Sequence, residues 1–431
     1  MLPLVLPPDA TLEHWLTYIE RVHPRTIEMG LERVASIKQK LGLAVTFPII
    51  TVGGTNGKGS ACAMLEAVLS EAGYKTGCYT SPHILRYNER VKIGRTEVSN
   101  ASLIEALRAV DAARGDVALT YFEFSTLAAV WLFARDSVDV AILEVGLGGR
   151  LDAVNAFDAD CALLMSVALD HMDYLGDTRE AIGYEKAGIF RAGRPAICAD
   201  AEPPDTVVKH AANVGAQLLL IGRDFTYESQ PRQWRYSGPG GRRHGLPLPA
   251  LRGEHQTANA AAVLAALDTL RERVPVSANA VRTGLLTAEN PARFQVMPGR
   301  PAVILDVAHN PAAARALGRN LRQMRCEGRT YAVFTMLKDK DIAGVIEATR
   351  AHIDQWVISP SEGTRGADIT LIRQALESAG VCESVHACEN VEAAYRFACE
   401  QASENDRIVV FGSFYTVAAV MGLRARARRA A

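Results

Sequence analysis

The sequence predicts an α/β protein with two domains, each built around a mostly parallel β-sheet. Three observations support this fold class: the length of the chain, the alternation of short apolar segments with helical patterns, and the restart of that alternation late in the chain. At 431 residues the chain is long enough for two or three domains of about 150 residues each. Its 48% hydrophobic content supplies apolar material for sizeable cores. Strands that alternate with helices are typical of parallel sheets with helices on both faces.

The first part of the chain carries the pattern of the first domain. Short apolar segments indicate buried strands, and apolar residues spaced three or four apart indicate helices. We expect strands over residues 47–52, 138–145 and 162–167, and helices over residues 64–72, 258–270 and 278–286. Residues 237–249 are rich in glycine, proline and arginine, and we expect a mobile, solvated loop there rather than a binding patch.

Glu289-Asn290-Pro291 predicts a break in this pattern, because proline interrupts regular structure. After the break, apolar segments predict further strands over residues 302–305, 331–334, 355–358 and 407–411. We therefore place one domain at residues 1–295 and a second, smaller domain at residues 296–431.

The charge balance and the cysteine pattern argue against several classes of protein. Lysine plus arginine total 47 and aspartate plus glutamate 48, so the net charge of −1 does not favour a nucleic-acid partner. The eight cysteines form no CxxC pair and no zinc-binding spacing, which is typical of a reducing cytosol. The apolar stretch at residues 2–6 is too short for a secretory signal, and no apolar run reaches the roughly 20 residues of a membrane span. We expect a cytoplasmic protein with no membrane partner.

The strongest local signal lies at residues 53–60, GGTNGKGS, between a predicted strand and a predicted helix. Glycines allow backbone N–H groups to converge on phosphate oxygens, and the start of a helix adds partial positive charge. Lys58 would supply a charge for the terminal phosphates, and Thr55 or Ser60 could reach phosphate or its magnesium. The usual Walker spacing is not met, because Gly59 separates Lys58 from Ser60. A glycine turn with a solvated lysine is the alternative, but the strand–turn–helix context favours nucleotide binding.

Polar residues also follow other predicted strands. Glu144 ends the apolar segment at residues 141–143, where a carboxylate is costly unless it binds a cation such as magnesium. Ser81 follows a short strand at residues 77–80, and His171 follows another strand. A capping glutamate, a turn serine and a hydrogen-bonded structural histidine are the alternatives. Because ligands bind at the carboxyl ends of parallel strands, we expect these three side chains to converge on one crevice.

Several segments, in order along the chain, carry a resemblance to a known family. They are residues 50–60 (ITVGGTNGKGS), 80–83 (TSPH) with 89–91 (ERV), 143–152 (LEVGLGGRLD), 169–171 (LDH) with 185–190 (EKAGIF), and 306–311 (DVAHNP). They resemble the motifs of folylpolyglutamate synthases, relatives of the Mur ligases, and most closely those of the bacterial bifunctional dihydrofolate synthases/folylpolyglutamate synthases. The resemblance implies an N-terminal P-loop-like ATPase domain with a mostly parallel sheet, followed by a smaller Rossmann-like α/β domain that ligates glutamate.

The resemblance also implies roles for individual residues. The residues it implies for ATP binding are Thr55, Asn56, Gly57, Lys58, Gly59, Ser60, Asn259, Arg293 and Asp306. The residues it implies for pterin binding are Glu28, Met29, Gly30, Leu31, Thr120, Tyr121, Phe122, Glu123, Leu151 and Lys186. The implied metal ligands are Ser81, Glu144 and His171, and the implied catalytic residues are Lys58, Lys186 and His309.

Some of these residues could have a purely structural role instead of the role that the resemblance implies. Phe122 could stack on a pterin ring and Glu123 could accept from its N–H groups, although an aromatic residue at helical spacing is usually part of a core. His309 and Asn310 could instead be satisfied caps of a loop. Alanine precedes Arg293 where the family often has glycine, which leaves the geometry of this turn open but not its charge.

Lys186, on a predicted helix, would by itself be interpreted as a surface lysine paired with an acid. In this family and in Mur ligases the matching lysine is commonly carbamylated, which converts a cation into an anionic ligand. A bare ammonium would repel magnesium. The resemblance therefore implies two Mg²⁺ ions, with ATP as co-substrate and N6-carboxylysine at Lys186 assisting His171 at the second ion.

The activity implied is that of an ATP-dependent carbon–nitrogen ligase joining L-glutamate to dihydropteroate, and to reduced folates, through an acyl phosphate. A folylpolyglutamate synthase without dihydropteroate activity and a Mur-type ligase acting on another carboxylate are the alternatives. A GTPase-like switch would require an Asn-Lys-x-Asp motif, yet no asparagine in the chain is followed by lysine. A non-catalytic nucleotide-binding module is disfavoured because every implied metal position is present. The expected partners are small molecules, and we expect a monomer.

Overall fold

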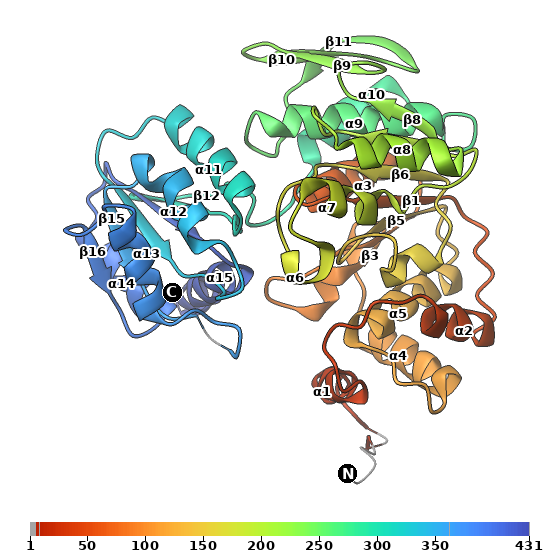
Figure 1. The fold of residues 1–431 in the computed structure, drawn as a ribbon, viewed down its shortest axis with the longest axis horizontal. Helices are drawn as coiled ribbons and strands as arrows, with labels where there is room; N and C mark the ends of the chain where they lie inside the picture. Colours follow the sequence, from red (N-terminus) through yellow and green to blue (C-terminus); the bar gives the residue numbers. More distant parts are fainter. Residues whose placement is uncertain (1–5, 8, 362, 431) are drawn as a thin grey trace. The chain divides into compact units, whose positions relative to one another are not determined.

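The computed structural model describes residues 6, 7, 9–361 and 363–430, with side chains as far as residue 427 (Figure 1). Most of the apolar stretch at residues 2–6 lies outside the described residues. The chain divides into two compact units. Unit 1 contains the residues up to 167 together with 177–250 and 257–288, and unit 2 contains residues 168–176, 251–256 and 289–431. The expected boundary at 295/296 therefore falls inside unit 2.

Unit 1 is built on an eight-stranded sheet in the order β4-β3-β2-β5-β1-β6-β7-β8. The six strands from β2 to β8 in this order run parallel, whereas β3 and β4 form an antiparallel edge. Every residue of β1, β5 and β6 is buried, which agrees with their unbroken apolar sequences. The strands are β1 (Ile49–Gly53), β2 (Thr76–Tyr79), β3 (Val91–Ile93), β4 (Thr96–Glu97), β5 (Val140–Glu144), β6 (Cys161–Leu164), β7 (Pro195–Cys198) and β8 (Gln217–Leu220).

Helices cover both faces of this sheet. A Cβ atom on Gly77 of β2 would lie 2.7 Å from the ring of Phe133, so α5 packs directly on one face. The next residue, Cys78, points to the other face, where α3 packs against β2. The helices of unit 1 are α1 (Leu12–Val22), α2 (Glu32–Lys40), α3 (Lys58–Glu71), η1 (Tyr87–Arg90), α4 (Asn100–Arg114), α5 (Tyr121–Arg135), η2 (Ala153–Ala156), α7 (Arg179–Ala187), α8 (Asp205–Val214), α9 (His255–Thr269, whose first two residues belong to unit 2) and α10 (Ala278–Thr287).

The expectation of a mobile loop at residues 237–249 is wrong. Most of these residues belong to a three-stranded antiparallel sheet of β9 (Thr226–Ser229), β10 (Gln233–Gly238) and β11 (Gly241–Pro247), at one end of unit 1 (Figure 1). Asp268 of α9 accepts hydrogen bonds from the Tyr236 hydroxyl at 2.8 Å and from the Gly240 N–H at 3.0 Å, and it pairs with Arg243. The sheet is ordered by this buried carboxylate from a later helix, which local composition does not reveal.

Unit 2 contains a second sheet, with six strands in the order β12-β13-β17-β14-β15-β16. Its strands are β12 (Gln295–Met297), β13 (Ala302–Leu305), β14 (Thr330–Phe334), β15 (Gln355–Ile358), β16 (Val385–Ala387) and β17 (Arg407–Phe411). All are parallel except β12, which pairs antiparallel with β13 and so places residues 295–297 in this unit. Its helices are α6 (Met172–Leu175), α11 (Pro311–Gln323), α12 (Ile342–Thr349), η3 (Arg350–His352), α13 (Ile369–Ser378), α14 (Val391–Gln401) and α15 (Phe414–Ala430).

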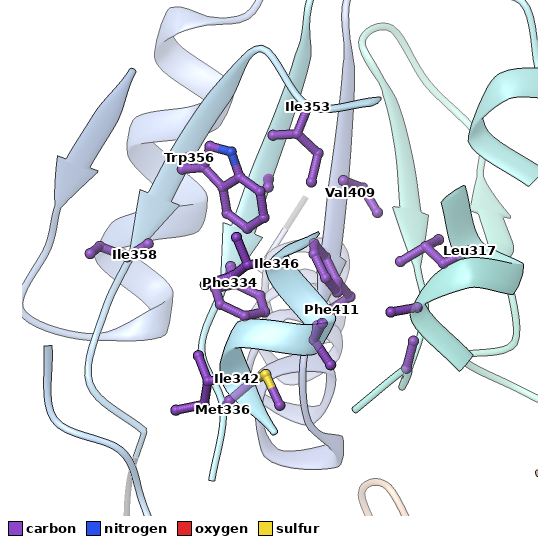
Figure 2. Packing of buried hydrophobic residues seen from close by; sticks show 14 of the residues in the cluster. Leu317, Phe334, Met336, Ile342, Ile346, Ile353, Trp356, Ile358, Val409 and Phe411 are labelled. Carbon is purple, nitrogen blue, oxygen red and sulfur yellow. The ribbon is translucent and has the colours of Figure 1, made fainter. Parts of the chain in front are cut away.

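Aromatic rings form the centre of the unit 2 core. Figure 2 shows Phe334, Trp356 and Phe411 packed together from three neighbouring strands, with Leu317 of α11 and Ile346 of α12 contributing to the same cluster. The Phe334 ring lies 5.3 Å from Trp356 in an edge-to-face arrangement and 4.9 Å from Phe411. Such pairs add to the stabilisation that their burial provides.

Within the described part of the chain, no helix is both long and apolar enough to cross a lipid bilayer.

Candidate active site

The glycine-rich loop of residues 53–60 joins β1 to α3, as its sequence predicts. Gly54 and Gly57 have φ of 138° and 90°, a region that favours glycine. The loop is anchored beyond β6: the Thr55 N–H donates to the Ser166 carbonyl at 2.7 Å, and the Asn56 N–H donates to the Ser166 hydroxyl at 3.0 Å. This anchoring holds the loop open around the first turn of α3, whose N–H groups form an anion-binding end.

Two predicted nucleotide residues meet at this loop. The Lys58 ammonium donates to the carbonyl of Gly54 at 3.0 Å and to that of Thr55 at 3.4 Å, so it lies over the loop. A Cβ atom on Gly57 would lie 3.0 Å from the Asn259 amide oxygen, which places α9 directly against the loop. The structure therefore brings Asn259 to the phosphate loop across about 200 residues of sequence.

Ser81 and Glu144 lie together at the ends of the adjacent strands β2 and β5. The Ser81 N–H donates to the Glu144 carboxylate at 3.1 Å, and the Glu144 residue is only 4% exposed. No group of three or more His, Cys, Asp or Glu residues among those the structure describes is arranged to hold a metal ion. A hydroxyl and a buried carboxylate nevertheless suit Mg²⁺, which takes few protein oxygens and fills its shell with water and phosphate.

The loop after β5 is organised by Asp152, to which the sequence assigned no role. Its carboxylate accepts from the backbone N–H groups of Gly146, Leu147 and Val154 at 3.1, 2.8 and 2.9 Å. Burial raises the pKa of Asp152 to about 6, although these hydrogen bonds and the charge of Lys58 oppose the rise. The Val145 N–H donates to the Val52 carbonyl at 2.9 Å, which places the start of this loop beside the start of the phosphate loop.

Lys186 lies on α7, as predicted, and is only 5% exposed, which is inconsistent with a surface lysine. The neighbouring acid, Glu185, pairs with Arg150 at 2.8 Å. A Cβ atom on Gly149 would lie 2.8 Å from the carbonyl oxygen of Lys186, so the loop after β5 packs closely on the end of α7. Lys186 is thus buried beside the loop that begins with Glu144.

The segments expected to bind the pterin are also brought together. The Gly30 N–H donates to the carbonyl of Leu151 at 3.3 Å, which joins the loop before α2 to the loop after β5. A Cβ atom on Gly146 would lie 2.6 Å from the Phe122 ring, and that ring lies 5.9 Å from the Tyr79 ring. Phe122 therefore packs against the ends of β2 and β5, the same two strands that carry Ser81 and Glu144.

Glu123 has structural contacts that the sequence did not reveal. Its carboxylate accepts from the Thr120 N–H at 2.7 Å and completes a capping box at the start of α5. It also pairs with Arg33 at 2.9 Å. The Glu123 carboxylate therefore already accepts from a backbone N–H and from a guanidinium within the protein. A carboxylate has about four acceptor sites, so it can still accept a hydrogen bond from a ligand.

A second group of predicted residues lies in unit 2 around Asp170. The Lys340 ammonium lies 2.6 Å from Asp170, the Asn310 amide donates to it at 3.2 Å, and the Nε2 atom of His309 lies 3.6 Å away. Burial alone would raise the pKa of Asp170, but the charges of His309, Lys340 and His171 hold it well below its ordinary value. The His309 Nδ1 atom bonds the Val307 carbonyl at 2.8 Å.

His171 has a left-handed backbone, with φ of 52°, and belongs to the same cluster. Its Nε2 atom lies 3.3 Å from the Lys340 ammonium. An ammonium at that position would oppose a divalent cation on the same nitrogen, so metal binding through Nε2 requires Lys340 to move. The expectation that His171 joins Ser81 and Glu144 stays a prediction.

Arg293 and Asp306 lie together at the start of unit 2. Asp306 accepts from the N–H groups of Phe294 at 2.9 Å and Ala308 at 2.8 Å, and burial raises its pKa against the charge of Arg293. The Arg293 guanidinium lies 5.5 Å from the ring of Phe414. Ala292 adopts φ of 60°, so the turn keeps the left-handed geometry that glycine would favour.

Sequence reasoning missed four residues that the structure brings to these groups. Asp152 and Asp170 stand inside segments that carried the resemblance, so their positions were marked although their roles were not. Phe414 follows the last predicted strand, which is where ligand-contacting loops begin. Nothing in the local sequence singles out Lys340, because its partner is 170 positions away.

Comparison with known proteins identifies the family. The Mur ligase middle domain matches residues 52–267, and the Mur ligase glutamate ligase domain matches residues 292–414. A dihydrofolate synthase/folylpolyglutamate synthase of Escherichia coli (strain K12) is 45% identical over 411 residues, or 95% of this chain and 94% of the relative. The chain belongs to the dihydrofolate synthase/folylpolyglutamate synthase family.

Solved structures of this family agree with the fold described above. E. coli FolC in complex with DHPP and ADP has a TM-score of 0.92 and 44% identity, with 97% of this chain and 99% of that chain covered. A bifunctional folylpolyglutamate synthase/dihydrofolate synthase with Mn, AMPPNP and L-glutamate bound has a TM-score of 0.90 and 43% identity, with 97% and 98% covered. The predicted family, α/β fold class and ligase class are confirmed.

Proposed function

We propose that this protein joins L-glutamate to dihydropteroate, forming dihydrofolate, and to reduced folates, using ATP. The observation that carries the proposal is the packing of the Phe122 ring against Gly146 and near Tyr79. This packing lies at the strand ends of Ser81 and Glu144, and the hydrogen bond from the Gly30 N–H to Leu151 joins residues 28–31 to the loop after β5, in the same unit as the phosphate loop. The relatives named above support the same substrates: FolC binds DHPP and ADP, and the bifunctional enzyme binds AMPPNP and L-glutamate.

The reaction proceeds in two steps. The substrate carboxylate attacks the γ-phosphate of ATP, which gives an acyl phosphate and ADP. The amine of glutamate then attacks the acyl carbon and phosphate leaves, which forms the amide. Negative charge on the transferring phosphoryl group must be balanced, and we propose that Lys58 and Arg293 supply the positive charge.

The metal requirement is assigned to residues of this chain as follows. We propose that Ser81 and Glu144 hold one Mg²⁺, and that His171 with a carbamylated Lys186 holds a second. Bound metal would neutralise charge on the phosphates of ATP. The burial of Lys186 supports carbamylation, because desolvation favours the neutral amine that reacts with carbon dioxide.

Two further predicted residues, Asp306 at the ATP site and His309 among the catalytic residues, lie in unit 2. Asp306 fixes the turn that carries Arg293 by accepting from the backbone of Phe294. His309 is oriented by the Val307 carbonyl, so that its other nitrogen lies near Asp170. We propose that His309, unlike Asp306, is a catalytic residue. The monomeric state stays a prediction, which sedimentation velocity would test.

The deciding experiment measures ADP release with dihydropteroate or tetrahydrofolate, each with and without L-glutamate. We expect release with either pterin compound when glutamate is present. Release with tetrahydrofolate alone would favour the narrower folylpolyglutamate synthase activity. If neither compound supports release, the proposed function is wrong and another carboxylate substrate must be sought.

A further inference from the structure

We propose that Arg33 is a positioning residue that joins the two walls of the pterin site and thereby sets the affinity for the pterin substrate. The proposal rests on the function proposed above, because it assigns residues 28–31 and 120–123 to the pterin site. Arg33 does not itself need to touch the substrate. It acts by holding Glu28 on one side and Glu123 on the other.

The contacts of Arg33 span the two segments. Its Nη1 atom donates to the Glu28 carboxylate at 3.0 Å, and its Nη2 atom donates to the Glu28 carbonyl at 2.9 Å. Its Nε atom donates to the Glu123 carboxylate at 3.1 Å, and Nη2 lies 2.9 Å from the same oxygen. A guanidinium can make these contacts at once because its five donors point in fixed directions.

Glu123 depends on this cation. Its side chain is 4% exposed, and a buried carboxylate without a cationic partner is unfavourable. The same carboxylate caps α5 through the Thr120 N–H. Arg33 therefore supports the first turn of the helix that presents Phe122, and a change at Arg33 would reach that ring through the helix cap.

The segment around Glu28 has weaker attachments elsewhere. The hydrogen bond from the Gly30 N–H to Leu151 is long, at 3.3 Å. His23 and Arg25 lie 3.3 and 3.6 Å from the Glu28 carboxylate, but Arg33 is the member of this trio that also pairs with Glu123. Without Arg33 we expect residues 28–31 to lose their fixed position relative to α5.

The test uses two variants of the full-length chain. Arg33→Met keeps a similar side-chain length but removes every donor, and Arg33→Lys keeps the charge but cannot bond both carboxylates in the same way. We expect Arg33→Met to raise KM for dihydropteroate about 10- to 100-fold, in line with the loss of charge-assisted hydrogen bonds. KM for ATP and kcat at saturating substrate should stay within about twofold of wild type, and Arg33→Lys should recover only part of the loss.

Arg114 provides a matched control in the same unit. Its side chain is 14% exposed, compared with 22% for Arg33, and it pairs with Asp111 at 2.7 Å and bonds the hydroxyl of Tyr18. Its hydrogen bonds join α4 to α1 and to residues 115–117, and none of them is made to residues 28–31 or 120–123, although the guanidinium lies 5.8 Å from the ring of Phe124. Arg114→Met should lower the thermal midpoint as Arg33→Met does but leave KM for dihydropteroate unchanged.

The outcomes separate the proposal from the proposed function. A wild-type protein that releases no ADP with any pterin substrate would overturn the function itself. An active wild type, with pterin KM unchanged in Arg33→Met or raised equally in Arg114→Met, would overturn the positioning role alone. If Arg33→Met does not fold, Arg33→Lys decides: wild-type KM would refute the proposal, and a selective rise in pterin KM would support it.

Discussion

Replacing Lys340 with methionine removes the ammonium that neutralises Asp170 in unit 2. The two charged groups lie 2.6 Å apart, and their side chains are 6% and 8% exposed. Removing one partner of a buried ion pair costs about 3–5 kcal/mol, because the other charge remains buried. Asp170 would still have the Asn310 amide at 3.2 Å and His309 at 3.6 Å. We therefore expect the lower end of this range, about 3 kcal/mol.

A double-mutant cycle measures how much of this loss belongs to the pair. The single variants Lys340→Met and Asp170→Asn are compared with the double variant, in which no unpaired charge is created. We expect the double variant to be less destabilised than the sum of the singles by about 2 kcal/mol, since replacing both partners is often nearly neutral.

Hydrogen exchange followed by mass spectrometry suits this measurement, because it reports on segments of a protein with two units. Peptides that cover residues 168–176 and 306–310 should exchange about 150-fold faster in Lys340→Met, the equivalent of about 3 kcal/mol. Arg365→Met is the control: Arg365 pairs with Asp339 at 2.6 Å but is 55% exposed, and such pairs contribute at most about 1 kcal/mol. Equal exchange in the two variants, or a coupling below about 0.5 kcal/mol, would refute the reasoning.

Four further predictions follow from the site. Glu144→Ala should abolish magnesium-dependent ADP release while sparing the metal-free thermal midpoint, because a buried acid is removed; turnover at saturating magnesium would contradict its role as a ligand. Lys186→Arg should be inactive, since guanidinium cannot be carbamylated, whereas wild-type rates would exclude the carbamate. Ala292→Val should lower the free energy of unfolding measured in urea by about 2 kcal/mol, because a β-branched residue is strained at the left-handed φ of this position. Ala292→Gly should change it by less than about 1 kcal/mol, because glycine adopts this φ readily. Similar losses in the two variants would be inconsistent with backbone strain as the cause. The pKa of Asp152 is about 6 in the folded protein and about 3.9 in the unfolded chain, so the wild-type free energy of unfolding should fall by up to about 3 kcal/mol as the pH rises from 4 to 6. Asp152→Asn should reduce this pH dependence. The same pH dependence in Asp152→Asn would show that Asp152 is not its source.

The strands of both sheets could be predicted because buried parallel strands are nearly continuous apolar runs. Residues 302–305, 355–358 and 407–411 match the observed strands at both ends. The sheet formed by β10 and β11 could not be predicted in the same way. Its polar groups are satisfied by Asp268, and its glycine and arginine content resembles that of a loop.

In the candidate site, too, some residues could be predicted from the sequence and others could not. The phosphate loop and the carboxylate of Glu144 were found because strand–turn–helix spacing and strand ends have a local sequence signature. Arg33 and Lys340 were missed because each acts on a carboxylate brought near by the fold, and an arginine or lysine on a surface helix or loop has no local mark of such a partner. Ala292 shows the reverse case: its residue type left the turn geometry open, and the structure gives it a left-handed φ of 60°.

The interleaved course of the chain has a consequence for dissecting this protein. The polypeptide passes between the two units five times, because residues 168–176 and 251–256 belong with the C-terminal portion. A gene fragment that starts at residue 289 would therefore encode Lys340 without Asp170. Neither unit is encoded by one continuous stretch of the gene. A fusion or circular permutation that divides the chain at residue 289 would therefore still separate residues 168–176 and 251–256 from the rest of unit 2.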